Sequence, residues 1–361
     1  MAKKSSNLNG DFEYVLLDEN QQDVDLRKKI LGLYSTNSAD ILWLELLDDS
    51  LVRNGYYKLF YYEQNVLKHI ILFKYDSEAQ KKIRVLNEGY RICNTHTENI
   101  SHILFSEFNK VQQIIFKGVF VANPEPSPKM IIEKITDDVV IPLPESMDDY
   151  LMKTIGKKTR KHIKVMINQF TNDYPDYEVH YFEKGDISKE QIDNVVSLSK
   201  ERMKTKGEKF VLNNAQYQYV ASSGLGFLCL CSIDGKTISG MISSIIGEHA
   251  YGHIIAHDNL YNKYFVGQIV LTHVIRCLIE KKKIKYLHML GGSYDYKVRH
   301  GGVIHDVYTI WTFRNEGINY LWTKTVNEMK ARYIKFKLTL KNKKTINTLY
   351  SKLNKIRTQP V

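Results

Sequence analysis

The fold of this chain is decided by two consecutive stretches, HDNLYNKYFVGQIVLTHVIRCLIEKKKI (257–284) and KYLHMLGGSYDYKVRHGG (285–302). The first ends a β-rich run at Asp258 and then opens a helix at Gly267, because apolar side chains recur from there at helical spacing. The second begins with the short apolar strand 285–290, which two glycines end. Strand, helix, strand is the order of two parallel strands joined by a helical crossover, and we expect that arrangement here.

Three more strands precede the crossover helix. The runs 226–233 and 236–246 flank Asp234-Gly235, a pair typical of a tight hairpin turn. The run 249–258 is the third strand, so an antiparallel meander turns parallel at the crossover. The predicted fold class is α/β, more fully an α+β arrangement in which helices flank a mixed central sheet.

The N-terminal half shows a fainter version of the same pattern. Its hairpin at 56–75 turns at Gln64-Asn65, between two β-rich runs. Helices are expected at 22–34, 40–52 and 98–114, and a further strand of the C-terminal half at 307–313.

The chain of 361 residues is long enough for two domains. Two prolines in 139–146 break any helix there, and Ser146 is placed to cap the next one, which is expected from Met147 to about Phe170. We therefore predict an N-terminal domain over 1–140, which is a degenerate version of the next one, a catalytic domain over 141–329 and a basic tail over 330–361.

The tail carries almost all of the excess charge. It contains ten Lys and Arg residues and no acid, against a formal net charge of +11 for the chain. The rest of the chain is close to neutral. The net charge is therefore only weak evidence that the folded body binds nucleic acid. The tail alternates bases with apolar residues, which suits an anionic membrane surface, although helices packed on the body are an equal alternative. Without a signal peptide or spanning segment, a cytoplasmic protein peripheral to the inner membrane is expected.

The two stretches resemble GNAT-superfamily acyltransferases of the CelD/BcsL (BioF2-like) type, associated with cell-surface polysaccharide synthesis, and the related FemAB-like transferases. The resemblance covers about residues 145–315 and, more faintly, 40–130. It rests on an Asp at a strand end, a Tyr-rich turn, a helix-opening Gly and a Gly-rich loop with Tyr-Lys. These residues are Asp258, Tyr261, Tyr264, Gly267, Gly291, Gly292, Tyr296, Lys297 and Gly301. The resemblance implies two tandem GNAT-like halves with the working site in the C-terminal one.

The resemblance also implies acyl-CoA as a co-substrate. Gly267 and Gln268 open a helix whose free amides suit a phosphate, and Tyr264 is expected beside them. A glycine that merely permits a tight turn is the alternative. The glycine-rich CoA loop of the family is reduced here to Gly267, so an acyl carrier protein or an aminoacyl-tRNA stays open as donor.

Transfer to an amine needs a base, for which Asp258 and His253 are the candidates, and Tyr294 is placed to protonate the departing thiolate. Alternation along a strand puts His253 and His257 on one face and Asp258 on the other, so one cleft receives all three only if a bulge intervenes. A structural role is the alternative for each histidine.

Substrate contacts are expected from the loop that follows the short strand. Tyr296, Lys297 and Arg299 lie there and suit a phosphate or a carboxylate. Lys158 and Arg160 belong to a basic helix block that suits an acidic partner. Solvated surface charges are the alternative for both groups. No metal-ligand cluster stands out.

We therefore expect an N- or O-acyltransferase that moves an acyl group from a thioester donor to an amine or hydroxyl on a sugar intermediate of surface glycan synthesis. A FemAB-like transferase that uses aminoacyl-tRNA is the first alternative. A non-catalytic GNAT-fold scaffold docked on a membrane is the second.

Overall fold

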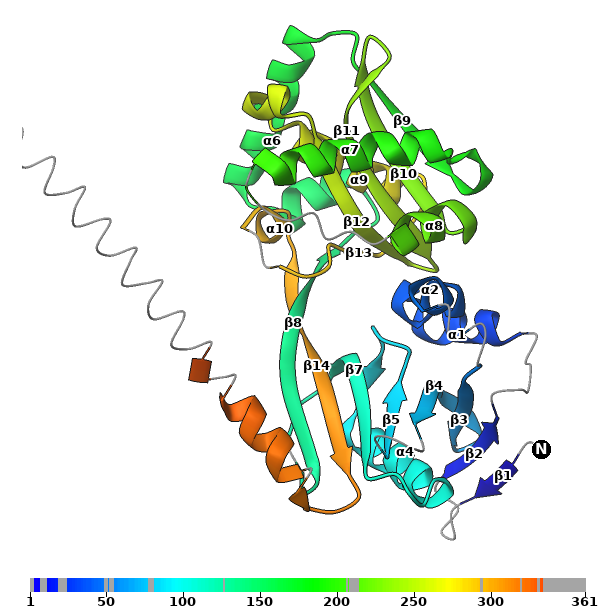
Figure 1. The fold of residues 1–361 in the computed structure, drawn as a ribbon. Helices are drawn as coiled ribbons and strands as arrows, with labels where there is room; N and C mark the ends of the chain where they lie inside the picture. The colour runs from blue at the N-terminus through cyan, green and yellow to red at the C-terminus, as the bar shows by residue number, and fades with distance from the viewer. Residues whose placement is uncertain are drawn as a thin grey trace, which may run out of the picture.

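The structure, a computed structural model, describes residues 3–6, 12–18, 25–48, 51, 55–76, 81–125, 127–205, 207, 214–292, 295–318, 320–329 and 332–333. Within them, 14 strands form one continuous sheet that runs through two halves stacked end to end (Figure 1). The tail from 334 onward, and with it the predicted membrane element, lies outside the described residues.

The first half contains most of the elements before residue 130. Its strands are β1 (Lys3–Ser6), β2 (Phe12–Leu17), β3 (Tyr57–Glu63), β4 (Val66–Asp76), β5 (Lys82–Val85), β6 (Arg91–Ile92) and β7 (Gln113–Val121), and its helices are α1 (Leu26–Tyr34), η1 (Asn37–Ala39), α2 (Ile41–Leu47) and α4 (Asn94–Glu107).

The second half follows the long strand β8 (Met130–Pro142). Its helices are α5 (Met147–Asp149), η2 (Tyr150–Thr154), α6 (Lys157–Asp173), η3 (Lys184–Asp186), α7 (Lys189–Thr205), α8 (Asn214–Ser222), η4 (Asn259–Tyr264), α9 (Val266–Glu280) and α10 (Asp295–Arg299). Its strands are β9 (Glu178–Glu183), β10 (Gly226–Ile233), β11 (Lys236–Ile246), β12 (His249–His257), β13 (Tyr286–His288) and β14 (Val303–Phe313).

The two halves repeat one topology. Strands β10, β11 and β12 form an antiparallel meander, and α9 then leads to β13, which is parallel to β12. In the first half β3, β4 and β5 form the meander, and α4 leads to β7, which is parallel to β5. Both hairpins turn through residues with positive φ, Gln64-Asn65 and Asp234-Gly235. The predicted mixed sheet and both hairpin turns are thus confirmed.

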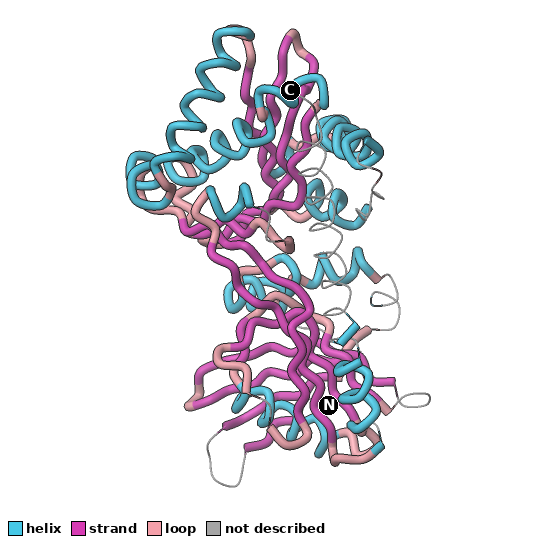
Figure 2. Tube along the Cα trace, turned by 90° about the vertical axis from the view of Figure 1, so that its left-hand side faces the viewer, coloured by secondary structure: helices cyan, strands magenta, loops and turns pink. Residues whose placement is uncertain are grey.

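Strands β8 and β14 join the halves. β8 pairs with β13 through Val140 to Pro142 and with β14 along most of its length. β14 lies between β8 and β7, and its Ile310 is fully buried in the core of the first half. The last strand therefore returns to the first half, and the division expected near residue 140 falls within β8 (Figures 1 and 2).

Two helix predictions are corrected. The helix expected at 98–114 ends at Glu107, and Gln113 instead begins β7, because the run Gln113 to Phe116 pairs with β14. The helix expected from Met147 is divided at Gly156, where the backbone is extended before α6 begins. The cap predicted at Ser146 is present, since its Oγ accepts from the amide of Asp149 at 3.1 Å.

Helices cover both faces of the second half. α6 and α9 bury one face of the sheet in a large apolar core, and α7 covers the other with a smaller one. No helix in the described part of the chain is long and apolar enough to span a bilayer.

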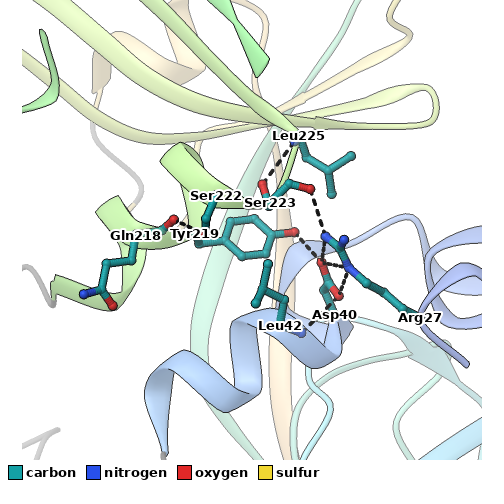
Figure 3. A network of polar contacts seen from close by, with 8 residues as sticks. All are labelled: Arg27, Asp40, Leu42, Gln218, Tyr219, Ser222, Ser223 and Leu225. Atoms are coloured by element: carbon teal, nitrogen blue, oxygen red, sulfur yellow. Dashed lines mark hydrogen bonds and ion pairs between the residues drawn. The ribbon is translucent and has the colours of Figure 1, made fainter. Parts of the chain in front are cut away.

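A polar network ties α1 and α2 of the first half to α8 of the second (Figure 3). The fully buried carboxylate of Asp40 accepts hydrogen bonds from the Arg27 guanidinium at 2.9 Å and from the Tyr219 hydroxyl at 2.9 Å. Arg27 also donates to the carbonyl of Ser223 at 3.2 Å. Trp43 packs edge-on against the Tyr219 ring at 5.2 Å, so apolar and polar contacts together fix this junction.

Candidate functional site

A pocket of about 370 Å³ lies where β12 ends and α9 begins. The helix α9 contributes Gly267 and Gln268 to its wall, and α10 contributes Tyr296. The remaining lining residues are Arg202 and Thr205 of α7, Ile255 and His257 of β12, and Asn259, Asn262 and Phe265 of the connecting turn. The pocket therefore lies at the carboxyl end of a strand beside a helix start, the usual place for a ligand in such sheets.

The first turn of α9 is built to leave amides available. Phe265 adopts the left-handed conformation with φ of 55° and directs its carbonyl to the amides of Gln268 and Ile269. The amides of Val266 and Gly267 precede the helical hydrogen bonds and carry the positive end of the helix dipole. A Cβ at Gly267 would stand 3.0 Å from His257 Nδ1, so glycine keeps this wall open.

A second, basic pocket of about 640 Å³ lies on the other side of Gln268, which lines both. Lys158 and Lys161 of α6 and Arg299 of α10 bring three cationic side chains to it, and Asp295 pairs with Arg299 at 2.9 Å. The two pockets together offer an apolar-lined slot beside a helix start and a cationic patch next to it. That combination suits a ligand with a phosphate-bearing end and a neutral arm.

The structure places two of the three residues that were expected to act in catalysis, and neither lines the α9 pocket. His253 is the extra residue of a bulge in β12, since Ile242 pairs with Ile254 and Ser243 with Gly252. The bulge turns its ring toward the first half, where it stacks on Trp43 at 5.9 Å, and burial lowers its pKa to about 4. His253 therefore lies away from the pocket, which corrects its expected place.

Asp258 also lies outside the pocket of α9. Its side chain caps η4 by accepting from the Leu260 amide at 3.0 Å, and it pairs with Lys236 at 3.5 Å beside the β10–β11 hairpin. The third catalytic candidate, Tyr294, lies outside the described residues.

Three further candidates stabilise the fold locally. Tyr264 is buried in the core and donates to Asp173 at 2.5 Å. Lys297 is buried, and its ammonium donates to the carbonyls of residues 289, 290 and 291 at 2.8 to 3.0 Å. Arg160 donates to the carbonyl of Leu151 in η2 at 2.8 Å. Gly267, Gln268, Tyr296, Arg299 and Lys158 are the candidates that do line the two pockets.

Arg202 and Thr205 are among the lining residues that sequence reasoning missed. Arg202 and Thr205 lie in the last turn of α7, and Arg202 donates to the Ile255 carbonyl at 3.4 Å. A basic residue near a helix end has a common structural explanation, so only the packing of α7 across β12 reveals their place. Among the described residues, no three His, Cys, Asp or Glu side chains form a group that could hold a metal ion.

Comparisons with known proteins agree with this geometry. A family model described as an acetyltransferase (GNAT) domain matches residues 157–298. That range contains the α9 pocket and, except for Arg299, the residues that line the basic pocket. No curated protein matches the chain.

Solved structures resemble the chain along most of its length. The crystal structure of FemX covers 84% of this chain and 99% of its own, with a TM-score of 0.58 and 10% identity. L-PGS from Bacillus licheniformis covers 88% and 99%, with a TM-score of 0.50 and 13% identity. A conserved protein of unknown function from Bacteroides thetaiotaomicron covers 82% and 100%, with a TM-score of 0.51 and 14% identity. The chain therefore shares the fold of these proteins, and its residues 157–298 match a GNAT-type acetyltransferase domain.

Proposed function

We propose that this protein transfers an acyl group from a thioester donor, acyl-CoA or an acyl carrier protein, to an amine or hydroxyl. The observation that carries the proposal is the pair of pockets that meet at Gln268. In this proposal the donor's phosphates bind the amides at Gly267, and its neutral arm lies along Ile255 and His257 of β12. The cationic side chains Lys158 and Arg299 bind the charged end of the donor.

The chemistry is direct attack of the acceptor on the thioester within a ternary complex. Holding both reactants in one site removes much of the entropic barrier, so no covalent enzyme intermediate is required. Tyr296 lines the donor pocket and is our candidate for the group that protonates the departing thiolate.

The acceptor class that we propose is a sugar intermediate of cell-surface polysaccharide synthesis, as in the CelD/BcsL type. The support is the Asp258, Gly267 and Tyr296-Lys297 pattern together with the GNAT domain match.

A second candidate is a FemAB-like aminoacyl transfer from charged tRNA. It is favoured by the cationic pocket of Lys158, Lys161 and Arg299, since arginine and lysine are the usual partners of nucleic-acid phosphates. The likeness to FemX shows a common fold and adds no evidence about the donor.

Thermal stabilisation tests the first proposal. We expect CoA and acetyl-CoA to raise the melting temperature, because a ligand that binds only the folded state stabilises it. Gly267→Asp should abolish the shift, since its side chain would press on His257 and place a negative charge where phosphate binds. Gly185→Asp makes the same charge change at an exposed glycine with open space around it, and should keep the shift.

The outcomes separate the two candidates. A shift that Gly267→Asp removes and Gly185→Asp retains supports acyl-CoA as donor. The absence of any shift with CoA or acyl-CoA contradicts that donor, and binding of tRNA that weakens steeply as salt rises would then support the second candidate.

A further inference from the structure

A row of polar side chains crosses four neighbouring strands where the two halves meet. The strand order is β12, β13, β8 and β14. His249 of β12 lies opposite Tyr286 of β13, and two residues further along the same strands Tyr251 lies opposite His288. Asp138 of β8 lies opposite His305 of β14. The residues that alternate with the polar row along the strands are buried in the α9 core. They are Ala250, Leu287 and Val139. The polar row therefore occupies the other face of the sheet.

Three members of the row form a hydrogen-bonded chain. His288 Nδ1 lies 2.6 Å from Asp138 Oδ2, and His288 Nε2 lies 2.9 Å from His249 Nδ1. Asp138 and His288 are buried, and Asp138 Oδ1 has no hydrogen-bond partner among the described residues. A carboxylate in such a place depends on the imidazole for its stabilisation. Asp138 thereby orients His288 as a donor through Nδ1.

This orientation determines which nitrogen of His249 can accept a proton. When both rings are neutral, His288 Nε2 is an acceptor, so His249 must donate to it through Nδ1. The Nε2 atom of His249 then carries the free lone pair, and within the described residues no hydrogen bond is made to it. His249 is half-buried, and burial lowers its pKa to about 4, so the ring is neutral near pH 7.

Aromatic side chains hold the two imidazoles in place. Tyr251 stacks on His288 with ring centroids 4.4 Å apart, and Tyr286 stacks on His249 at 4.9 Å. The Tyr251 hydroxyl donates to the Ser35 carbonyl of the first half at 2.7 Å, so the packing of the halves fixes this cluster.

The parallel pairing of β12 with β13 ends beside the cluster, at Tyr251 and His288. Strands β12 and β13 are paired only from His249 to Tyr251, and the amide of Met289 then bonds to β8 at Val139. Beyond this point β12 continues beside β11, without β13, to His257 in the pocket wall, a span of six residues or about 20 Å. An elongated donor arm that enters at Gly267 therefore brings its reactive end toward the cluster.

We propose that Asp138, His288 and His249 form the acceptor side of the active site, with His249 Nε2 as the base that takes the proton of the attacking amine or hydroxyl. This inference rests on the acyl transfer proposed above. The acceptor's nitrogen or oxygen bonds to the thioester carbon and its proton passes to His249 Nε2 as the C–S bond breaks. The resulting imidazolium is stabilised through His288 by the Asp138 carboxylate. The proton then leaves with the thiolate as a thiol, so that acyl ester or amide and free thiol are the products.

The test combines a chemical probe with kinetics. We expect diethyl pyrocarbonate to carbethoxylate His249 rapidly at pH 7, as located by peptide mass spectrometry, and more slowly in Asp138→Asn, where the asparagine side chain cannot fix the same tautomer. With acetyl-CoA and a panel of amino sugars, His249→Gln should lower kcat for thiol release about 100-fold. Asp138 is a positioning residue, so Asp138→Asn should lower kcat and leave the KM for acetyl-CoA unchanged. His180→Gln, an exposed histidine of β9, is the matched control with unchanged rates.

Each result decides something distinct. Full turnover in a folded His249→Gln variant, or a His249 no more reactive than His180, overturns the role of the cluster and leaves the proposed acyl transfer standing. If the wild-type protein releases no thiol from acetyl-CoA, the proposed function fails and the role of His249 as acceptor base fails with it, while the carbethoxylation rates still show whether Asp138 activates the imidazole.

Discussion

At the scale of single residues, Lys297 shows how a charged side chain can serve the fold. Its buried ammonium binds three consecutive carbonyls where β13 ends, and burial lowers its pKa. Lys297→Met keeps the apolar stem and removes the donor, so one buried and two part-buried carbonyls lose their partner. We expect the free energy of unfolding to fall by about 3 kcal/mol, as measured by denaturant titration.

The matched control is Lys164→Met, because Lys164 is an exposed lysine of α6. It should change stability by less than about 0.5 kcal/mol. Equal stabilities of the two variants would contradict the structural role of Lys297 and return it to the expected place among the substrate contacts.

At the scale of elements, β14 completes the sheet of the first half although it is the last strand of the second. Ile310 is fully buried there, whereas Ile304 of the same strand is 45% exposed. Ile310→Ala should lower the free energy of unfolding by about 3 kcal/mol, because it leaves a cavity in a packed core. Ile304→Ala should lower the free energy of unfolding much less. Thermal melting curves of the two variants test this difference.

The same pair of variants tests whether the halves unfold together. A single transition that shifts to lower temperature in Ile310→Ala is expected, because β8 and β14 pair across both halves. A second transition, with the α9 core melting at its original temperature, would show that the halves are independent.

At the scale of the whole molecule, the Arg27, Asp40 and Tyr219 network sets how the halves meet (Figure 3). Asp40→Asn removes the charge that the Arg27 guanidinium neutralises and leaves a buried amide with mismatched partners. We expect a loss of about 3 kcal/mol in the free energy of unfolding. Asp176→Asn, an exposed aspartate, is the control and should be neutral.

The polar row makes a second polar contact between the halves, since the Tyr251 hydroxyl donates to the Ser35 carbonyl just after α1. If Asp40→Asn kept full stability, the junction would depend on apolar packing around Trp43 alone.

The amino-acid sequence by itself determined the local elements and the mixed sheet. Asp234-Gly235 and Gln64-Asn65 specify tight turns because these residues accept positive φ, and Ser188 with Gln191 specifies the start of α7 through a reciprocal cap. The crossover at 257–302 follows from apolar spacing, which acts over a few residues. The placement of Gly267 and Gln268 at a helix start follows from the same signal.

Only the tertiary structure decided which side chains share a site. A one-residue bulge turned His253 to the opposite face from His257, and a buried cluster of carbonyls drew Lys297 away from solvent. Asp138 lies 150 residues before His288 in the chain, and His249 lies 39 residues before it. The three meet because β8, β13 and β12 are neighbours in the sheet. Strand partners are chosen by packing over the whole chain, so short-range patterns do not encode them.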